Sequence, residues 1–316
     1  MNASSFKFVA LEIGRQILRT YLTLLKIMVP ILLVVRVLDL AGGTQVLARL
    51  LEPVMSFVGL PGSMALVWAS TILGNIYAGM AVFVNLYPEG LTLAQVSTAG
   101  ILMLLAHNLP IEGEIARKAG IPWRYTLVLR IGGALVLGSL CFIITQSLPG
   151  WNQPATLAWT APLQNPDWGE WLLTQLKMLL LILVVISILI AGLRLLRLLG
   201  IERILHALLA PLLKIVGIGR EATTITLIGS TLGLAFGGAL LIDEVNSGRV
   251  NRRDIVLAIS FLGLCHSLIE DTLLILLLGC SLWVVLGARL LFALIVVFLL
   301  SKILAVEPGE KTIDPL

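Results

Sequence analysis

The stretch Cys265-His266-Ser267-Leu268-Ile269-Glu270-Asp271 places a histidine, a hydroxyl and two carboxylates inside a long apolar segment. Ionisable groups are costly in such surroundings and usually mark a functional site when the segment lies in a membrane. A second stretch, Ala106-His107-Asn108-Leu109-Pro110-Ile111-Glu112, is a rougher copy of the first. The two histidines are 159 residues apart. We therefore predict two copies of one repeat.

Other residues support this separation. At the same spacing Glu112 falls on Asp271, Arg130 on Arg289, Gly74 on Gly233, Gly79 on Gly238 and Gly120 on Gly279. So many coincidences at one spacing are not expected by chance. Each half of the chain is thus predicted to carry an equivalent polar cluster.

The composition indicates an all-α polytopic membrane protein. Hydrophobic residues make up 58% of the chain and charged residues 13%, whereas soluble domains carry about 25% charged residues. The net charge of +4 is typical of basic cytoplasmic loops and does not require a nucleic-acid partner. No zinc-finger, RNA-binding or helix-turn-helix motif is present, and the three cysteines in apolar surroundings predict no disulfide framework.

The hydrophobicity pattern and the glycine and proline residues that end helices divide the chain into five parts. We expect an amphipathic surface helix (1–20), a first membrane repeat (21–146), a linker rich in tryptophan (147–171), a second repeat (172–302) and a tail (303–316). Each repeat contains a first span, an amphipathic piece, a glycine-interrupted apolar segment, a capped helix that carries the histidine, and a last span. The predicted ranges are 21–40, 45–57, 63–85, 92–119 and 123–145, then 172–191, 195–216, 222–242, 251–278 and 281–300.

The distribution of basic residues predicts the topology. Four basic residues before position 27 place the N-terminus in the cytoplasm. The linker has no basic residue and is therefore expected outside. If residues 222–242 crossed completely, Arg249, Arg252 and Arg253 would lie outside, against the positive-inside rule. A re-entrant helical hairpin returns them to the cytoplasm. Three spans plus one hairpin per repeat then invert the second repeat and place the C-terminus in the cytoplasm.

The candidate site combines both histidine helices with both hairpins. His107 and His266 fall near mid-bilayer; His266 and Glu270 are expected on one helix face, and Pro110 is expected to kink the first helix. The predicted solute-binding or ion-binding residues are His107, Asn108, Glu112, His266, Ser267, Glu270, Asp271, Asn75, Thr71, Ser230, Thr231, Arg130 and Arg289. The predicted hairpin glycines are Gly74, Gly79, Gly233, Gly237 and Gly238.

Each signal also has a structural interpretation. The His–carboxylate pairs can hold helices together, and the glycines can serve close helix packing. The two arginines can pair with Glu112 and Asp271, meet an anionic substrate, or reach the interface. Imidazole and carboxylate together also suit zinc, iron or manganese, with His107, His266, Glu270 and Asp271 as ligands. Since no hydrolase, metalloprotease or P-loop motif occurs, we do not expect an enzyme.

The second half resembles the Gate, or nucleoside-recognition, domain membrane proteins. The resemblance rests on residues 217–222, Leu232-Gly233-Leu234-Ala235-Phe236-Gly237-Gly238 and residues 262–271, and it extends in two copies over residues 21–302. This group is related to spore maturation membrane proteins, the membrane region of the ferrous iron transporter B and, distantly, the concentrative nucleoside transporters. The resemblance implies a permease with paired hairpins. We do not find the hairpin-tip motif of the nucleoside transporters in this sequence. Nor do we find the paired cysteines and the GTPase domain of the iron transporter, so the resemblance does not predict the substrate.

The leading hypothesis is a bacterial inner-membrane permease that moves a small polar solute, such as a nucleoside, by alternating access. A divalent-cation transporter and a non-transporting assembly protein with structural His–carboxylate pairs are the alternatives, followed by an intramembrane metalloenzyme. No resident cofactor is expected; a proton, Na⁺ or a divalent metal is the expected coupling ion. The expected partners are the lipid bilayer and the solute. A homo-oligomer is an open alternative.

Overall fold

The computed structural model describes residues 3–86, 90–156, 167–247 and 250–304. Within these ranges the regular structure is helical, apart from one isolated bridge between Thr92 and Pro154. The predicted all-α class is therefore confirmed. Most of the predicted tail (305–316), the middle of the linker with Trp159, and Arg249 lie outside the described residues.

The same order of elements occurs twice along the described chain. The first series is α1 (Ala3–Leu40), α2 (Gly43–Phe57), α3 (Met64–Leu73), α4 (Ile76–Leu86), α5 (Leu93–Leu105), α6 (Leu109–Lys118), α7 (Trp123–Leu127), the π-helical turn η1 (Val128–Gly132) and α8 (Gly133–Gln146). The second is α9 (Trp168–Leu198), α10 (Ile201–Ile215), α11 (Arg220–Leu232), α12 (Leu234–Ser247), α13 (Arg252–Leu264), α14 (Glu270–Leu276), η2 (Trp283–Ala288) and α15 (Arg289–Ile303). Gly42 and Gly200 stand before α2 and α10 with φ of 73° and 76°.

Two predicted domain boundaries fall inside helices. Helix α1 is continuous through residue 20, so the expected surface helix and the first span form one element. Helix α9 begins at Trp168, where the side chain of Asp167 accepts a hydrogen bond from the backbone N–H of Glu170 and caps the first turn. The end of the predicted linker is therefore already helical.

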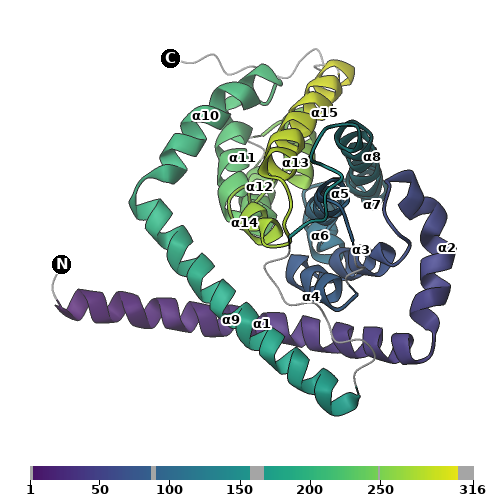
Figure 1. The fold of residues 1–316 in the computed structure, drawn as a ribbon. Helices are drawn as coiled ribbons and strands as arrows, with labels where there is room; N and C mark the ends of the chain where they lie inside the picture. Colours follow the sequence, from purple (N-terminus) through teal and green to yellow (C-terminus); the bar gives the residue numbers. More distant parts are fainter. Residues whose placement is uncertain (1–2, 87–89, 157–166, 248–249, 305–316) are drawn as a thin grey trace, which may run out of the picture.

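Long helices form an outer frame around a shorter-helix bundle. Figure 1 shows α1 and α9 crossing each other, with α2 and α10 on opposite sides of the bundle. At the crossing the Tyr21 hydroxyl donates a hydrogen bond to the carbonyl oxygen of Leu179 (3.1 Å), and Arg194 pairs with Glu12 (3.0 Å). These two contacts join the frame helices of the two halves.

The frame and the last helices expose large apolar side chains on α1, α8, α9 and α15. Among the described residues, four helices are long and apolar enough to cross a membrane: Leu11–Leu40, Trp123–Gln146, Trp168–Leu198 and Trp283–Ile303. The bent pair α5–α6 is a fifth by the same criterion. Apolar side chains exposed over this length fit lipid rather than water as the surroundings.

The glycine-interrupted segments fold back on themselves. A Cβ atom at Gly79 of α4 would lie 1.8 Å from the hydroxyl oxygen of Thr71 on α3, and one at Gly237 would lie 2.5 Å from the Cα of Gly229. Residues on both sides of each break thus touch, and α3–α4 and α11–α12 are helical hairpins. Each arm has 10 to 14 residues. That is about 15–21 Å, less than the roughly 30 Å of a bilayer core.

The two histidine helices are broken, which corrects the expectation of continuous helices over 92–119 and 251–278. The first breaks between α5 and α6, with a bend of 40°, and the second between α13 and α14. Asn108 and Ser267 adopt left-handed backbone conformations at equivalent places, with φ of 50° and 45°. His266 and Glu270 therefore do not share a helix face. Pro110 lies in the first turn of α6 and does not kink a helix. Proline is tolerated there because the N–H groups of a first turn have no acceptor within the helix.

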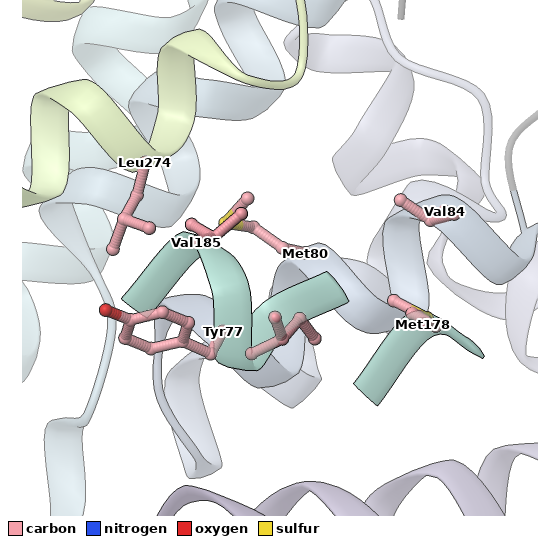
Figure 2. Close-up of a pocket in the computed structure, with 7 residues that line it drawn as sticks. Tyr77, Met80, Val84, Met178, Val185 and Leu274 are labelled. Atoms are coloured by element: carbon pink, nitrogen blue, oxygen red, sulfur yellow. The ribbon is translucent and has the colours of Figure 1, made fainter. Parts of the chain in front are cut away.

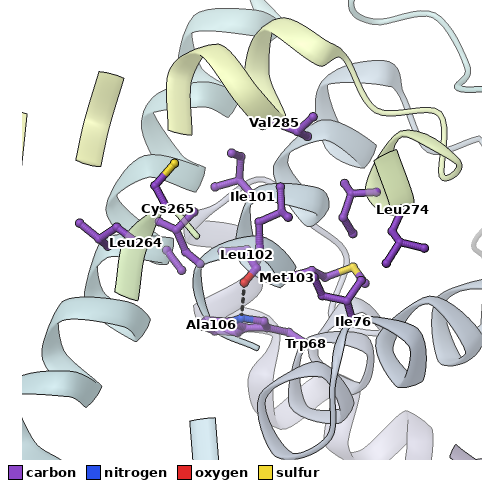
Figure 3. Close-up of a cluster of buried hydrophobic side chains, with 14 of the residues drawn as sticks. Trp68, Ile76, Ile101, Leu102, Met103, Ala106, Leu264, Cys265, Leu274 and Val285 are labelled. Atoms are coloured by element: carbon purple, nitrogen blue, oxygen red, sulfur yellow. Dashed lines mark hydrogen bonds between the residues drawn. The ribbon is translucent and has the colours of Figure 1, made fainter. Parts of the chain in front are cut away.

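The interior between the halves is apolar and packed from both sides. Figure 3 shows Leu102 and Met103 of α5 beside Leu264, Leu274 and Val285 of the second half. Cys265 is fully buried in the same cluster. The break regions are thus enclosed by protein on the side of this cluster.

The close approach inside the first hairpin can be tested with two Gly→Ala substitutions. We expect Gly79→Ala to destabilise the protein by about 1–3 kcal/mol, because the added methyl group overlaps Thr71. Gly192→Ala on α9 is the control, because its methyl group meets nothing within 4 Å and alanine favours a helix. Thermal unfolding in detergent measures both. Equal melting temperatures for the two variants would contradict the hairpin packing.

Candidate functional site

Two histidines from the two halves meet at the helix breaks. The Nε2 atoms of His107 and His266 lie 3.0 Å apart, and the ring centroids are 4.9 Å apart at an interplanar angle of 51°. The residues are 5% and 2% exposed. The repeat thus brings its two histidines into direct contact at a buried point.

The other ring nitrogen of each histidine is fixed by the end of its own broken helix. His107 Nδ1 lies 3.1 and 3.0 Å from the carbonyl oxygens of Met103 and Leu104, and His266 Nδ1 lies 2.6 Å from that of Leu262. A carbonyl oxygen only accepts, so each Nδ1 carries a proton and each neutral ring presents a lone pair at Nε2. Two facing lone pairs at 3.0 Å repel each other. A cation between them, either a proton or a metal ion, would remove this repulsion.

Two carboxylates complete the cluster. Glu112 Oε1 lies 3.4 Å from the Nε2 atom of each histidine, and Asp271 Oδ2 lies 3.6 Å from His107 and 3.9 Å from His266. Both acids stand in the first turn of the second helix piece, α6 or α14, where the helix dipole favours negative charge. Asp271 Oδ2 is buried and has no hydrogen-bond donor. Asn108 lies beside the cluster, with Nδ2 3.5 Å from Glu112 Oε1.

The two arginines are fully buried, so the interpretation that they reach the interface is wrong. Arg130 forms an ion pair with Glu112 Oε2 and donates from Nε to the carbonyl oxygen of Leu105 (2.8 Å). Arg289 donates from Nε to the backbone carbonyl oxygen of Leu264 and from Nη2 to that of His266, both at 3.0 Å. Within the described residues no ion pair joins Arg289 to Asp271.

Each arginine therefore satisfies the last carbonyl group of a broken helix, α5 or α13, where no intrahelical donor exists. The positive charge also suits the negative end of the helix dipole. Both arginines belong to or directly follow a π-helical turn, η1 or η2, a feature that often occurs at functional sites. Of the alternatives left open for Arg130, the contacts support pairing with Glu112.

The hairpins contribute backbone rather than side-chain groups. Asn108 N–H donates to the carbonyl oxygen of Thr71 (3.0 Å), and Leu268 N–H donates to that of Ser230 (2.8 Å). The hydroxyls of Thr71 and Ser230 bond to carbonyl groups of their own helices. Each hairpin thus holds one helix break in place.

Of the predicted hairpin-tip residues, one glycine lies at the site. A Cβ atom at Gly233 would lie 2.9 Å from the Ser267 hydroxyl oxygen, so this tip faces the second break. The positive φ of 91° at Gly233 also requires glycine. Its counterpart Gly74 packs against Ile31 of α1 instead.

The remaining predicted residues serve other contacts. Asn75 Oδ1 accepts a hydrogen bond from Ala78 N–H, and the Thr231 hydroxyl lies near His206 and Glu202 of α10. Gly79, Gly237 and Gly238 permit close packing against Thr71, Gly229 and Ile115. Glu270 faces Tyr77 rather than the histidines. For the three glycines the packing interpretation is therefore the one that the contacts support.

Two aromatic residues near the site escaped the sequence analysis. The Trp68 indole N–H donates to the carbonyl oxygen of Leu102 at the end of α5 (3.0 Å). Tyr77 lines a small apolar pocket between α4, α9 and α14, which Figure 2 shows with Met80, Met178 and Leu274. The pocket holds about 10 Å³, roughly the space of one water molecule. It is too small for a nucleoside.

The buried Arg130–Glu112 pair can be tested by removing one partner. We expect Arg130→Gln to lower the free energy of unfolding by about 3–5 kcal/mol, because Glu112 is left as an uncompensated buried charge. Arg124→Gln, at an exposed position of α7, should change it by less than about 0.5 kcal/mol. Unfolding in detergent compares the two variants. A similar loss in both would show that the ion pair is not part of the stable core.

The comparisons with known proteins identify one relative at high coverage. The chain is 32% identical over 285 residues to YvoD of Bacillus subtilis (strain 168), which is named an uncharacterized membrane protein. The match covers 88% of this chain and 89% of YvoD. No family model matches, so the resemblance to the Gate-domain proteins stays a prediction, and no solved structure matches at a significant level. At this identity and coverage, the chain belongs to the family of the membrane protein YvoD.

Proposed function

We propose that this membrane protein is an inner-membrane permease that moves a small polar or charged solute by alternating access. The solute site is the buried cluster of His107, His266, Glu112 and Asp271. One observation carries the proposal: the site is built from two equivalent broken helices, one from each half of the chain. Broken helices that meet at a repeat interface are the typical binding site of secondary transporters.

The repeated order of elements supports an inverted arrangement. In the first half the long first helix, the bent pair α5–α6 and the last helix are the elements suited to crossing. Helix α9, the broken segment α13–α14 and η2–α15 occupy the same places in the second half, whereas the hairpin arms are too short. Three crossings per half reverse the direction of the second half. The inverted halves would then place equivalent histidines at the same depth, as their contact requires.

Unmatched polar groups favour binding over a purely structural role. Asp271 Oδ2, Arg130 Nη2 and Arg289 Nη1 are buried without a hydrogen-bond partner. Structural polar clusters in proteins are normally satisfied, and an exception calls for an explanation such as a ligand. An assembly protein that used these groups only to hold helices together would gain nothing from leaving them unpaired.

The close contact between the two histidines favours a solute as small as a single ion. The histidine rings touch, and side chains of both halves enclose them. We interpret the structure as an occluded state. A nucleoside would require the two halves to separate before it could bind at this point, whereas an ion would not.

Alternating access can be tested at Ser267, which lies at the site and is 8% exposed. We expect Ser267→Cys to react with a membrane-impermeant thiol reagent added outside the vesicles in both orientations. Right-side-out vesicles then test access from the external face of the membrane, and inverted vesicles test access from the cytoplasmic face. The parent chain is the control, because its three cysteines are buried and Cys265 is fully so.

The result is read from the mass of the labelled chain. Labelling from one side only, or from neither side in a variant that keeps the parent melting temperature, would contradict alternating access. Since the assay needs no knowledge of the solute, it tests the permease mechanism by itself.

A further inference from the structure

We propose that the cluster binds a divalent transition-metal cation of the zinc class. Its ligands are His107 Nε2, His266 Nε2, Asp271 Oδ2 and Glu112 Oε1. This inference rests on the permease function proposed above and names the class of solute, because the ion is the cargo. The argument proceeds from the spacing of the four atoms, their orientation and the charge around them.

The spacing of the donor atoms fits tetrahedral coordination. Zinc bonds of about 2.0–2.2 Å to nitrogen and oxygen place tetrahedral ligand atoms roughly 3.3–3.6 Å apart. The two Nε2 atoms are 3.0 Å apart, Glu112 Oε1 is 3.4 Å from both, and Asp271 Oδ2 is 3.6 and 3.9 Å from them. These five distances lie within about 0.3 Å of the tetrahedral range.

Each ligand is held with its lone pair toward the centre. The carbonyl groups that bind Nδ1 of each histidine leave Nε2 free, as outer-shell partners do in metal sites. Arg130 holds Glu112 by Oε2 and leaves Oε1 toward the histidines. Asp271 Oδ2 is buried and has no hydrogen-bond donor. A metal ion would supply the missing partner.

The types of ligand select the class of ion. Two imidazoles with carboxylates suit zinc, iron or manganese, whereas calcium and magnesium prefer oxygen ligands alone. The Cys265 side chain lies in the apolar cluster, and Glu270 faces Tyr77, so neither belongs to the ligand set. Of the metal set expected from the sequence, His107, His266 and Asp271 lie together, and Glu112 rather than Glu270 stands beside the two histidines.

The surrounding charge suits an ion that must leave again. The two buried arginines offset the charges of Glu112 and Asp271, while Glu270 adds one negative charge nearby. A divalent ion therefore enters a site of small net charge and is held less strongly than between two unopposed carboxylates. Transport requires binding that still allows release.

Cobalt(II) is a suitable probe, because tetrahedral nitrogen and oxygen ligands give it strong visible absorption bands. We expect the full-length protein in detergent to bind one Co²⁺ per chain with these bands, and Zn²⁺ but neither Mg²⁺ nor Ca²⁺ to displace it. His107→Gln, His266→Gln and Asp271→Asn should each weaken the affinity by more than about tenfold.

Matched controls exist for both ligand types. His206→Gln changes the third histidine, on α10, and Glu114→Gln changes an acid of α6 that pairs with Arg117 away from the cluster; both should bind Co²⁺ like the parent. If a ligand variant does not fold, the rise in the melting temperature of the parent with Zn²⁺ but not with Mg²⁺ tests the same claim. Absence of tetrahedral bands and of this rise, or full binding by the folded ligand variants, would overturn the metal site.

The metal and permease claims fail in different ways. Labelling of Ser267→Cys from both sides without Co²⁺ binding would preserve the permease and overturn the metal, leaving a proton as the cation between the histidines. Tetrahedral Co²⁺ binding with labelling from neither side would show a resident structural metal and overturn transport. Labelling of Ser267→Cys from both sides together with tetrahedral Co²⁺ binding supports the metal ion as the cargo.

Discussion

The structure depends on how the backbone polar groups at two helix breaks are satisfied inside an apolar bundle. A break exposes carbonyl and N–H groups that lipid cannot bind, so protein groups must take their place. Histidine Nδ1 and arginine Nε bond the carbonyl groups at the ends of α5 and α13, and the hairpin carbonyls of Thr71 and Ser230 accept from the N–H groups just beyond the histidines. The same contacts determine the positions of the hairpins, the last helices and the site.

The chemistry of the site follows from these backbone contacts. Since each Nδ1 is committed to a carbonyl group, both Nε2 atoms turn toward each other and toward Glu112 and Asp271. The break also places these acids in the first turns of α6 and α14, where the helix dipole favours their charge. The contacts that end two helices thus bring the groups of the proposed cation site together between the halves, and an equivalent contribution from each half is what alternating access requires.

The sequence predicted the elements better than the details of the site. The 159-residue spacing, the hairpins interrupted by glycine and the pairing of Arg130 with Glu112 were all visible in residue types and periodicity. The helix breaks were not, because Gly263, three residues before His266, lies inside an apolar run and did not by itself indicate a break; after His107, the sequence Asn108-Leu109-Pro110 was the available signal. The assumed continuous helix put Glu270 with His266, whereas the break turns Asp271 toward the histidines. Long-range contacts such as Tyr77 with Glu270 have no local signature.

X-ray absorption spectroscopy of the zinc-loaded protein in detergent tests the central claim most directly, because it reports the atoms around the ion. The account predicts four nitrogen or oxygen neighbours at about 2.0–2.2 Å, with outer-shell scattering from two imidazole rings that falls to one ring in His266→Gln and is unchanged in His206→Gln. A shell of oxygen atoms without imidazole scattering, or a spectrum that His266→Gln leaves unaltered, would contradict a cation site between the two histidines.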